Sequence, residues 1–233
     1  MIVIFSSIKG GTGKSTLAFH IAVQAFLDKT DICTIDLDFP QFSFSTYYNN
    51  RKNYNLPVWK DHIFASSIEE IKKIEEDINI KNDKLIIIDT PGRYEPSLLE
   101  MHKKADIIIT PINDSFIDIN TIMKIEKEKW STFGNYYEFI YDSKNYNEKL
   151  KWLVIRNRSS PISSNHTKEI QKKLAELSKK IDFKLLDGPK DRSIYRELFN
   201  KGATVLDLKS KLSISNIAAK FEIKSIWKEI KNS

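Results

Sequence analysis

The fold is decided by the stretch Ile8-Lys9-Gly10-Gly11-Thr12-Gly13-Lys14-Ser15-Thr16. It follows the apolar run Ile2-Val3-Ile4-Phe5 and opens a segment with helical periodicity, so the predicted order is strand, glycine-rich loop, helix. Glycines let backbone N–H groups turn towards phosphate oxygens, and the helix N-terminus adds a positive dipole. In such a loop Lys14 reaches the β- and γ-phosphates and the Ser15 hydroxyl binds Mg²⁺. The whole segment from Gly10 to Thr16 is therefore predicted to cradle a nucleoside triphosphate.

The spacing departs from the common pattern G-x-x-x-x-G-K-[ST], because Ile8 stands where the first glycine is expected. The pattern K-G-G-x-G-K-S fits in full and adds a second lysine, Lys9. In this respect the chain resembles the ParA/MinD family of ATPases. The resemblance implies ATP and Mg²⁺ as cofactors, and it implies that Lys9 crosses a dimer interface to the ATP phosphates of a second subunit. A dinucleotide loop does not fit, because Thr16 stands where its third glycine belongs.

The composition is that of one globular domain. The chain has 233 residues with 41% apolar and 29% charged residues, and we expect a single ATPase domain over residues 1–233. The lone cysteine, Cys33, excludes an internal disulfide and a cysteine-rich metal site. The net charge of +6 favours DNA or an anionic membrane as partner, although a Lys-, Ile- and Asn-rich composition from AT-biased coding would produce it as well.

Membrane insertion and export are not expected. No apolar run approaches the roughly 20 residues of a membrane span. The first predicted strand starts at Ile2 and leaves no room for a signal peptide. A cytoplasmic location is the expectation.

Two further apolar runs end in carboxylates. Ile32–Ile35 leads into Asp36-Leu37-Asp38, and Leu85–Ile88 leads into Asp89. Such runs, alternating with helical segments, predict an α/β fold with a mostly parallel central sheet and helices on both faces. Carboxylates at the carboxyl ends of parallel strands meet in the crevice where ligands bind.

The resemblance assigns roles to these residues. Asp89 holds Mg²⁺ as the carboxylate of a Walker B strand, and Asp36 belongs to the surroundings of the ion. Asp38 contacts the attacking water, unless it only caps the next helix. Gly92 begins the second switch segment and meets the γ-phosphate.

The second half of the chain carries fewer signals. Asn157, after the strand Lys151–Arg156, is implied by the resemblance to read the adenine edge, with Arg158 beside it; a strand-end turn is the alternative. Arg192 and Arg196 are four apart on one helical face and could bind DNA phosphates together, or they could pair with Asp191 and Glu197. The Tyr- and Asn-rich segment from Asn135 to Asn147 is interpreted as a surface excursion.

Three phrases resemble the MipZ branch of the family, within a resemblance that runs from Ile2 to about Leu208. They are Asp-Leu-Asp-x-x-Gln from position 36, Thr-Pro-x-Asn-Asp-Ser-Phe-x-Asp from position 110, and Asp-Arg-x-x-Tyr-Arg-Glu-Leu-Phe from position 191. In the second phrase Asp114 or Ser115 is either a helix N-cap or a functional contact. This branch implies an ATP-dependent homodimer that binds the nucleoid without sequence preference and inhibits FtsZ polymerisation. It also implies that the ParB–centromere complex recruits the monomers and so sets up a gradient.

Other functions remain open at this point. A ParA-type chromosome or plasmid partition ATPase would share the chemistry and move DNA instead. A metabolic P-loop ligase such as dethiobiotin synthetase would not need Lys9, and a binding module with a dead site would not need Lys14, Ser15, Asp38 and Asp89 intact. The last helix, with Ile223, Ile226, Trp227 and Ile230 on one face, is expected to dock on the sheet and not on a membrane surface.

Overall fold

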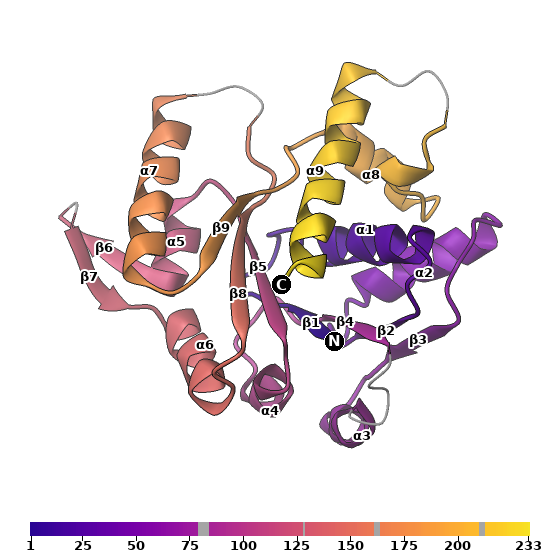
Figure 1. Ribbon diagram of the computed structural model, residues 1–233, viewed down its shortest axis with the longest axis horizontal. Helices are drawn as coiled ribbons and strands as arrows, with labels where there is room; N and C mark the ends of the chain where they lie inside the picture. Colours follow the sequence, from indigo (N-terminus) through magenta and orange to yellow (C-terminus); the bar gives the residue numbers. More distant parts are fainter. Residues whose placement is uncertain (79–83, 128, 161–163, 210–212) are drawn as a thin grey trace.

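Seven parallel strands form the centre of the computed structural model, which describes residues 1–78, 84–127, 129–160, 164–209 and 213–233 (Figure 1). The strand order is β3-β2-β4-β1-β5-β8-β9. The strands are β1 (Ile2–Phe5), β2 (Ile32–Asp36), β3 (Asp61–Phe64), β4 (Leu85–Asp89), β5 (Ile107–Ile112), β8 (Lys151–Arg156) and β9 (Lys184–Asp187). The predicted parallel sheet is confirmed.

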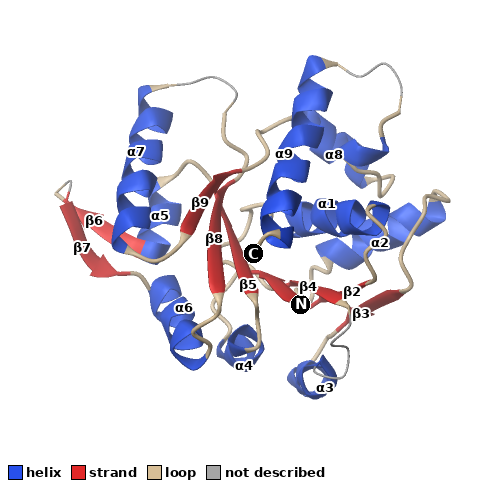
Figure 2. Ribbon diagram, in the orientation of Figure 1, coloured by secondary structure: helices blue, strands red, loops and turns tan. Residues whose placement is uncertain are grey.

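Helices cover both faces of this sheet (Figure 2). One face carries α1 (Lys14–Leu27), α2 (Ser43–Asn53), α8 (Ser193–Phe199) and α9 (Ile214–Lys231), with the short turn η3 (Val205–Asp207). The other carries α3 (Ile68–Ile78), α4 (Leu99–Lys103), α5 (Phe116–Ile122), α6 (Asn135–Tyr146) and α7 (Asn165–Lys180), with the turn η2 (Pro96–Leu98). A hairpin of β6 (Met123–Glu126) and β7 (Lys129–Phe133) packs beside them.

The central strands β1 and β4 are aliphatic or aromatic up to the terminal Asp89 of β4, because both faces of the sheet are covered. In β1, Ile2 and Ile4 belong to the core under α3 to α7, whereas Val3 and Phe5 belong to the core under α1 and α9. Strand β4 divides its side chains in the same way. Two-sided burial accounts for continuous aliphatic runs where a one-sided sheet would show alternation.

The last helix docks on the sheet, as expected. Ile223, Ile226, Trp227 and Ile230 of α9 are buried, and the Trp227 indole N–H donates to an Asp28 carboxylate oxygen at 2.6 Å. No helix among the described residues is long and apolar enough to cross a membrane.

The interpretation of residues 135–147 as a surface excursion is wrong. The segment forms α6, in which Tyr136, Phe139 and Ile140 are buried, and the Tyr136 hydroxyl donates to the Ser6 carbonyl oxygen at 2.8 Å. These apolar residues lie at helical spacing i, i+3 and i+4. Tyr and Asn have modest helix propensity, and packing against α4 and α5 overrides it here.

Candidate nucleotide-binding site

A groove lies at the carboxyl ends of the strands and follows the glycine-rich loop. Its first part is a cavity of about 540 Å³. Its second part is a cavity of about 310 Å³. The two share Gly13, Thr16, Tyr47, Arg158 and Phe199 in their walls, so they adjoin one another beside the loop. Such a groove has room for phosphates at one end and a base at the other.

The glycine-rich loop has the backbone shape that a phosphate cradle needs. Gly11 and Gly13 have φ angles of 78° and 83°, in the left-handed region that favours glycine. A Cβ at Gly13 would also lie 2.4 Å from Asn157 Nδ2. Thr12 is buried, and its carbonyl oxygen accepts a hydrogen bond from Asn157 Nδ2 at 2.7 Å. Thr12 therefore anchors the loop, while Gly10 and Gly11 face the cavity.

The two residues that open α1 face the same cavity. Lys14 and Ser15 both line it, and Lys14 Nζ donates to Ser7 Oγ at 3.2 Å. Burial lowers the pKa of Lys14, and the nearby carboxylates of Asp89 and Asp38 oppose that shift. A partly desolvated ammonium beside free volume is suited to an incoming phosphate.

Asp89 is the least satisfied group in the site. Burial, and after it the Asp36 carboxylate, raises the pKa of Asp89 to about 8, against the opposing effects of Ser15 and Lys14. The Ser15 hydroxyl is close enough to affect this pKa, yet neither Asp89 oxygen has a hydrogen bond of normal geometry to any described residue. A buried carboxylate without a partner, next to a hydroxyl, fits the oxygen ligands that Mg²⁺ prefers. The residues present therefore fit the ion.

The described residues supply only part of a metal shell. Among them no group of three or more His, Cys, Asp or Glu side chains could hold a metal ion. That agrees with the usual habit of Mg²⁺, which takes one or two protein carboxylates and completes its shell with water and substrate phosphates.

Asp36 lies directly beside Asp89, because the two are Cα partners at the ends of β2 and β4. Its oxygens are already engaged. Oδ2 accepts from both the backbone N–H and the hydroxyl of Ser45 at 2.8 Å, and Oδ1 accepts from the Asp38 N–H at 3.1 Å. Asp36 therefore ties the start of α2 and the loop with Asp38 to the end of the sheet at which Asp89 lies.

Asp38 and Gly92 complete the wall of the first cavity. Asp38 is half-buried, and burial raises its pKa. A Cβ at Gly92 would lie 2.8 Å from the Gly10 Cα, so only glycine allows this close approach of the two loops. Arg93 lines the same wall and donates to the Phe39 carbonyl oxygen at 3.2 Å. The sequence motifs did not single out Arg93, since a lone arginine after Gly92 carries no pattern of its own.

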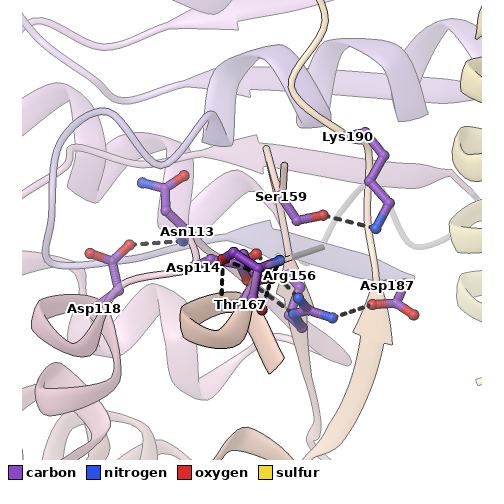
Figure 3. A network of polar contacts seen from close by, with 9 residues as sticks. Asn113, Asp114, Asp118, Arg156, Ser159, Thr167, Asp187 and Lys190 are labelled. Atoms are coloured by element: carbon purple, nitrogen blue, oxygen red, sulfur yellow. Dashed lines mark hydrogen bonds and ion pairs between the residues drawn. The ribbon is translucent and has the colours of Figure 1, made fainter. Parts of the chain in front are cut away.

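Lys9 forms an ion pair with Asp118, and its side chain is 36% exposed. Asp118 is buried in the first turn of α5, and its other oxygen accepts from the Asn113 N–H at 2.8 Å (Figure 3). Asp118 was not among the predicted site residues, because 109 residues separate it from Lys9.

The neighbouring residues Asp114 and Ser115 both have partners within the fold. Ser115 caps α5, its hydroxyl accepting from the Ile117 N–H, which confirms one of the two capping candidates. Asp114 instead binds Arg156 at 3.1 and 3.2 Å, and Arg156 also reaches Asp187 at 3.1 Å (Figure 3).

Asn157 and Arg158 lie at the second cavity. Asn157 is buried behind Thr12 and Gly13, and Arg158 donates to the Gly11 carbonyl oxygen at 3.0 Å. Tyr195 is a wall residue that the motifs did not assign to the nucleotide. Its hydroxyl is close enough to Arg192 for the two groups to affect each other's pKa, yet it has no hydrogen bond of normal geometry to any described residue. Its place in the Asp-Arg-x-x-Tyr phrase was the available signal.

Arg192 and Arg196 do not form one helical face, because α8 begins only at Ser193. Arg192 makes two hydrogen bonds to Glu222, at 2.6 and 2.8 Å, and a third to Ser215. Arg196 is 61% exposed and reaches Asp191 at 3.2 Å. Of the pairings predicted with Asp191 and Glu197, the structure contains the one between Arg196 and Asp191. Arg196 is thus the freer cation.

Comparisons with known proteins agree with this geometry. A family described as ATPase MipZ matches residues 1–233. The fold is similar to Cyanothece McdA in an ATP complex, with 12% identity, a TM-score of 0.71, and coverage of 99% of this chain and 96% of that one. It is also similar to the Aquifex aeolicus MinC:MinD cell division protein complex, with 16% identity, a TM-score of 0.66 and coverage of 100% and 96%.

A third similar structure is a plasmid partition protein of Borrelia burgdorferi bound to AMPPNP, with 17% identity, a TM-score of 0.60 and coverage of 98% of both chains. No curated protein matches the chain in sequence.

Proposed function

The chain belongs to the family of MipZ ATPases, within the ParA/MinD group, and from that premise we propose that it is an ATP-dependent dimerisation switch that regulates placement of the division site. The observation that carries this proposal is the buried, unpartnered carboxylate of Asp89 beside Lys14 and Ser15 at the start of α1. A divalent cation bound next to a buried, unpartnered carboxylate strongly stabilises its negative charge.

The residues divide the work by position. Lys14, the loop amides and the α1 N-terminus bind the phosphates, and Ser15 and Asp89 hold Mg²⁺ with Asp36 beside them. When bound, Mg²⁺ neutralises charge that develops on the transferred phosphoryl group. Asp38, half-exposed in the cavity wall, orients water. Gly92 brings its loop to the γ-phosphate, and Asn157 and Arg158 take the base end.

Lys9 acts after it leaves Asp118. In one subunit the ion pair with Asp118 holds the Lys9 ammonium away from the phosphates of its own loop. When two subunits close over two ATP molecules, Lys9 exchanges this carboxylate for phosphate oxygens of the second subunit, where it stabilises the transition-state charge as an arginine finger does. Hydrolysis removes the γ-phosphate contacts and the dimer separates.

The output follows the MipZ branch. The ATP-bound dimer would bind the nucleoid without sequence preference and inhibit FtsZ polymerisation, and the ParB–centromere complex would recruit the monomers. Exposed Arg196 is the stronger candidate for a DNA phosphate contact, because Arg192 is committed to Glu222. Binding of this kind weakens steeply with salt.

A partition ATPase that moves DNA is the second candidate, and the fold similarity to the Borrelia burgdorferi plasmid partition protein favours keeping it. A polymerisation assay separates the two. If the protein regulates the division site, the ATP-bound dimer should shorten FtsZ filaments. If it is a partition ATPase, it should have no effect on them.

The test of the switch itself is solution mass by light scattering, for the wild type and Asp38→Ala, with ADP and then with ATP and Mg²⁺. We expect a monomer with ADP and, for Asp38→Ala, a persistent dimer with ATP. A dimer in every condition would point to a metabolic ligase, and a monomer throughout would rule out action of Lys9 in trans.

A further inference from the structure

A chain of hydrogen bonds leads from the edge strand β3 to the carboxylate beside the metal site. The Trp59 indole N–H donates to Thr34 Oγ1 at 2.8 Å, and Thr34 Oγ1 lies 2.9 Å from His62 Nδ1. His62 Nε2 lies 3.0 Å from Ser45 Oγ, which donates to Asp36 Oδ2 at 2.8 Å. None of these side chains belongs to the phosphate loop, and no motif singled out His62.

The Asp36 end of this chain determines the direction of its bonds. An indole N–H only donates and an ionised carboxylate only accepts. The Thr34 hydroxyl accepts from Trp59, and its own proton remains to be donated. The Ser45 hydroxyl donates to Asp36, so it accepts from His62 Nε2. The imidazole therefore carries a proton on Nε2, and in the neutral ring the bare Nδ1 accepts from the Thr34 hydroxyl, so that each hydroxyl accepts once and donates once.

Two aromatic rings of α2 hold the imidazole ring in place. It stacks on Tyr48 with ring centroids 4.4 Å apart and on Phe44 with centroids 5.7 Å apart. Burial lowers the pKa of His62 to about 4, so the neutral form that the chain requires is the one present near pH 7. Because the His62 Nε2–H is fixed in place and occupies a lone pair of Ser45 Oγ, the Ser45 hydroxyl proton is directed towards Asp36.

We propose that His62 is a positioning residue: through Ser45 it orients the Asp36 carboxylate, and so fixes the loop with Asp38 for Mg²⁺-dependent nucleotide binding. This inference rests on the proposed function. Asp36 has no freedom to rotate while Ser45 and the Asp38 N–H occupy its oxygens. Without the bond from His62, the Ser45 hydroxyl can turn away, and the buried Asp36 carboxylate adds more unscreened charge next to Asp89.

Three variants separate positioning from mere packing. His62→Leu removes the donor to Ser45, and His62→Gln returns an N–H near the Nε2 position. Tyr48→Phe is the matched control, because it removes a neighbouring hydrogen bond to the Trp59 carbonyl oxygen and leaves the chain from Thr34 to Asp36 intact.

The first measurement needs no nucleotide. ¹⁵N NMR of the histidine side chains in the full-length wild type is expected to show His62 with a protonated Nε2 and a bare Nδ1. A protonated Nδ1 would overturn the inference, because the chain could not then run from Trp59 to Asp36. This readout stands even where a variant fails to fold.

The second measurement is AMPPNP binding as a function of Mg²⁺ concentration. Partners behind metal-binding groups typically change metal affinity by about 10- to 100-fold. We expect His62→Leu to raise the half-saturating Mg²⁺ concentration about 10-fold, His62→Gln to recover most of the loss, and Tyr48→Phe to leave it unchanged. The same Mg²⁺ requirement in the wild type and His62→Leu would overturn the inference. A wild type that binds no AMPPNP would instead refute the proposed function, while the tautomer result would still judge the hydrogen-bond chain.

Discussion

Replacing Asp89 by asparagine should stabilise the nucleotide-free protein, and the gain should grow with pH. In the folded chain burial and Asp36 raise the pKa of Asp89 from 3.8 to about 8. Below pH 4 the carboxyl is protonated in both the folded and the unfolded chain, and its ionisation costs no stability. As pH rises towards 8 the unfolded chain has lost this proton and the folded chain keeps it, so the wild type is progressively destabilised. An asparagine side chain of the same shape has no proton to lose.

The slope is that of one proton. A difference of one bound proton changes the free energy of unfolding by about 1.4 kcal/mol per pH unit. Between about pH 5.5 and 7.5 the stability of Asp89→Asn relative to the wild type should rise by about 3 kcal/mol. The buried His20, His62 and His102 act in the opposite direction, since burial lowers the pKa of each to about 4 and stability then rises with pH up to 6.5. They are present in both proteins, so the difference between the two curves isolates Asp89.

Urea unfolding of both proteins at several pH values, without nucleotide or Mg²⁺, gives this difference directly. Parallel curves across that range would refute the reasoning, because they would mean that Asp89 ionises in the folded chain as it does in the unfolded one. Adding ATP and Mg²⁺ should narrow the difference between the two proteins. A ligand at 100 times its Kd stabilises the protein that binds it by about 2.7 kcal/mol, and only the wild type should gain that much.

Three other substitutions test the rest of the site. Gly13→Ala should lower the free energy of unfolding in urea by about 1 to 3 kcal/mol and abolish ATP binding, because the φ angle is 83° and the added Cβ lacks room. Gly10→Ala is the control, because no atom outside its chain neighbours lies within 4 Å of the Cβ that it adds. Equal losses in the two variants would contradict the explanation. Asp118→Asn should lower the dissociation constant of the ATP-dependent dimer about threefold in sedimentation, because a partly exposed ion pair with Lys9 no longer has to be broken. Weaker dimerisation would mean that this ion pair assists the closing of the two subunits. Arg196→Gln should lower the slope of DNA affinity against salt by about 1 in a binding titration and leave stability unchanged, and an unaltered slope would exclude this contact.

Much of the fold, and the residues of the candidate phosphate site, could be predicted from local sequence patterns. A glycine-rich loop between a strand and a helix has few other uses, and Asp89 after four aliphatic residues had to lie at the carboxyl end of a central strand. The interpretation of residues 135–147 as a surface excursion was wrong because the local pattern there is weak. Three apolar positions there were diluted by Tyr and Asn, and α6 forms because tertiary packing covers those positions.

By itself the sequence determined which chemistry is present: an order of strand, loop and helix, and carboxylates placed at strand ends. Strands and helices have short hydrophobic periods, and the loop and the carboxylates directly follow such segments, so residues close together in the sequence are enough to predict these features. Only the tertiary structure decided that Asp118 holds Lys9, that Asn157 braces the loop through Thr12, and that His62 reaches Asp36 through Ser45. Such pairs join segments far apart in the chain, and their geometry depends on strand order and helix packing, which no local pattern encodes.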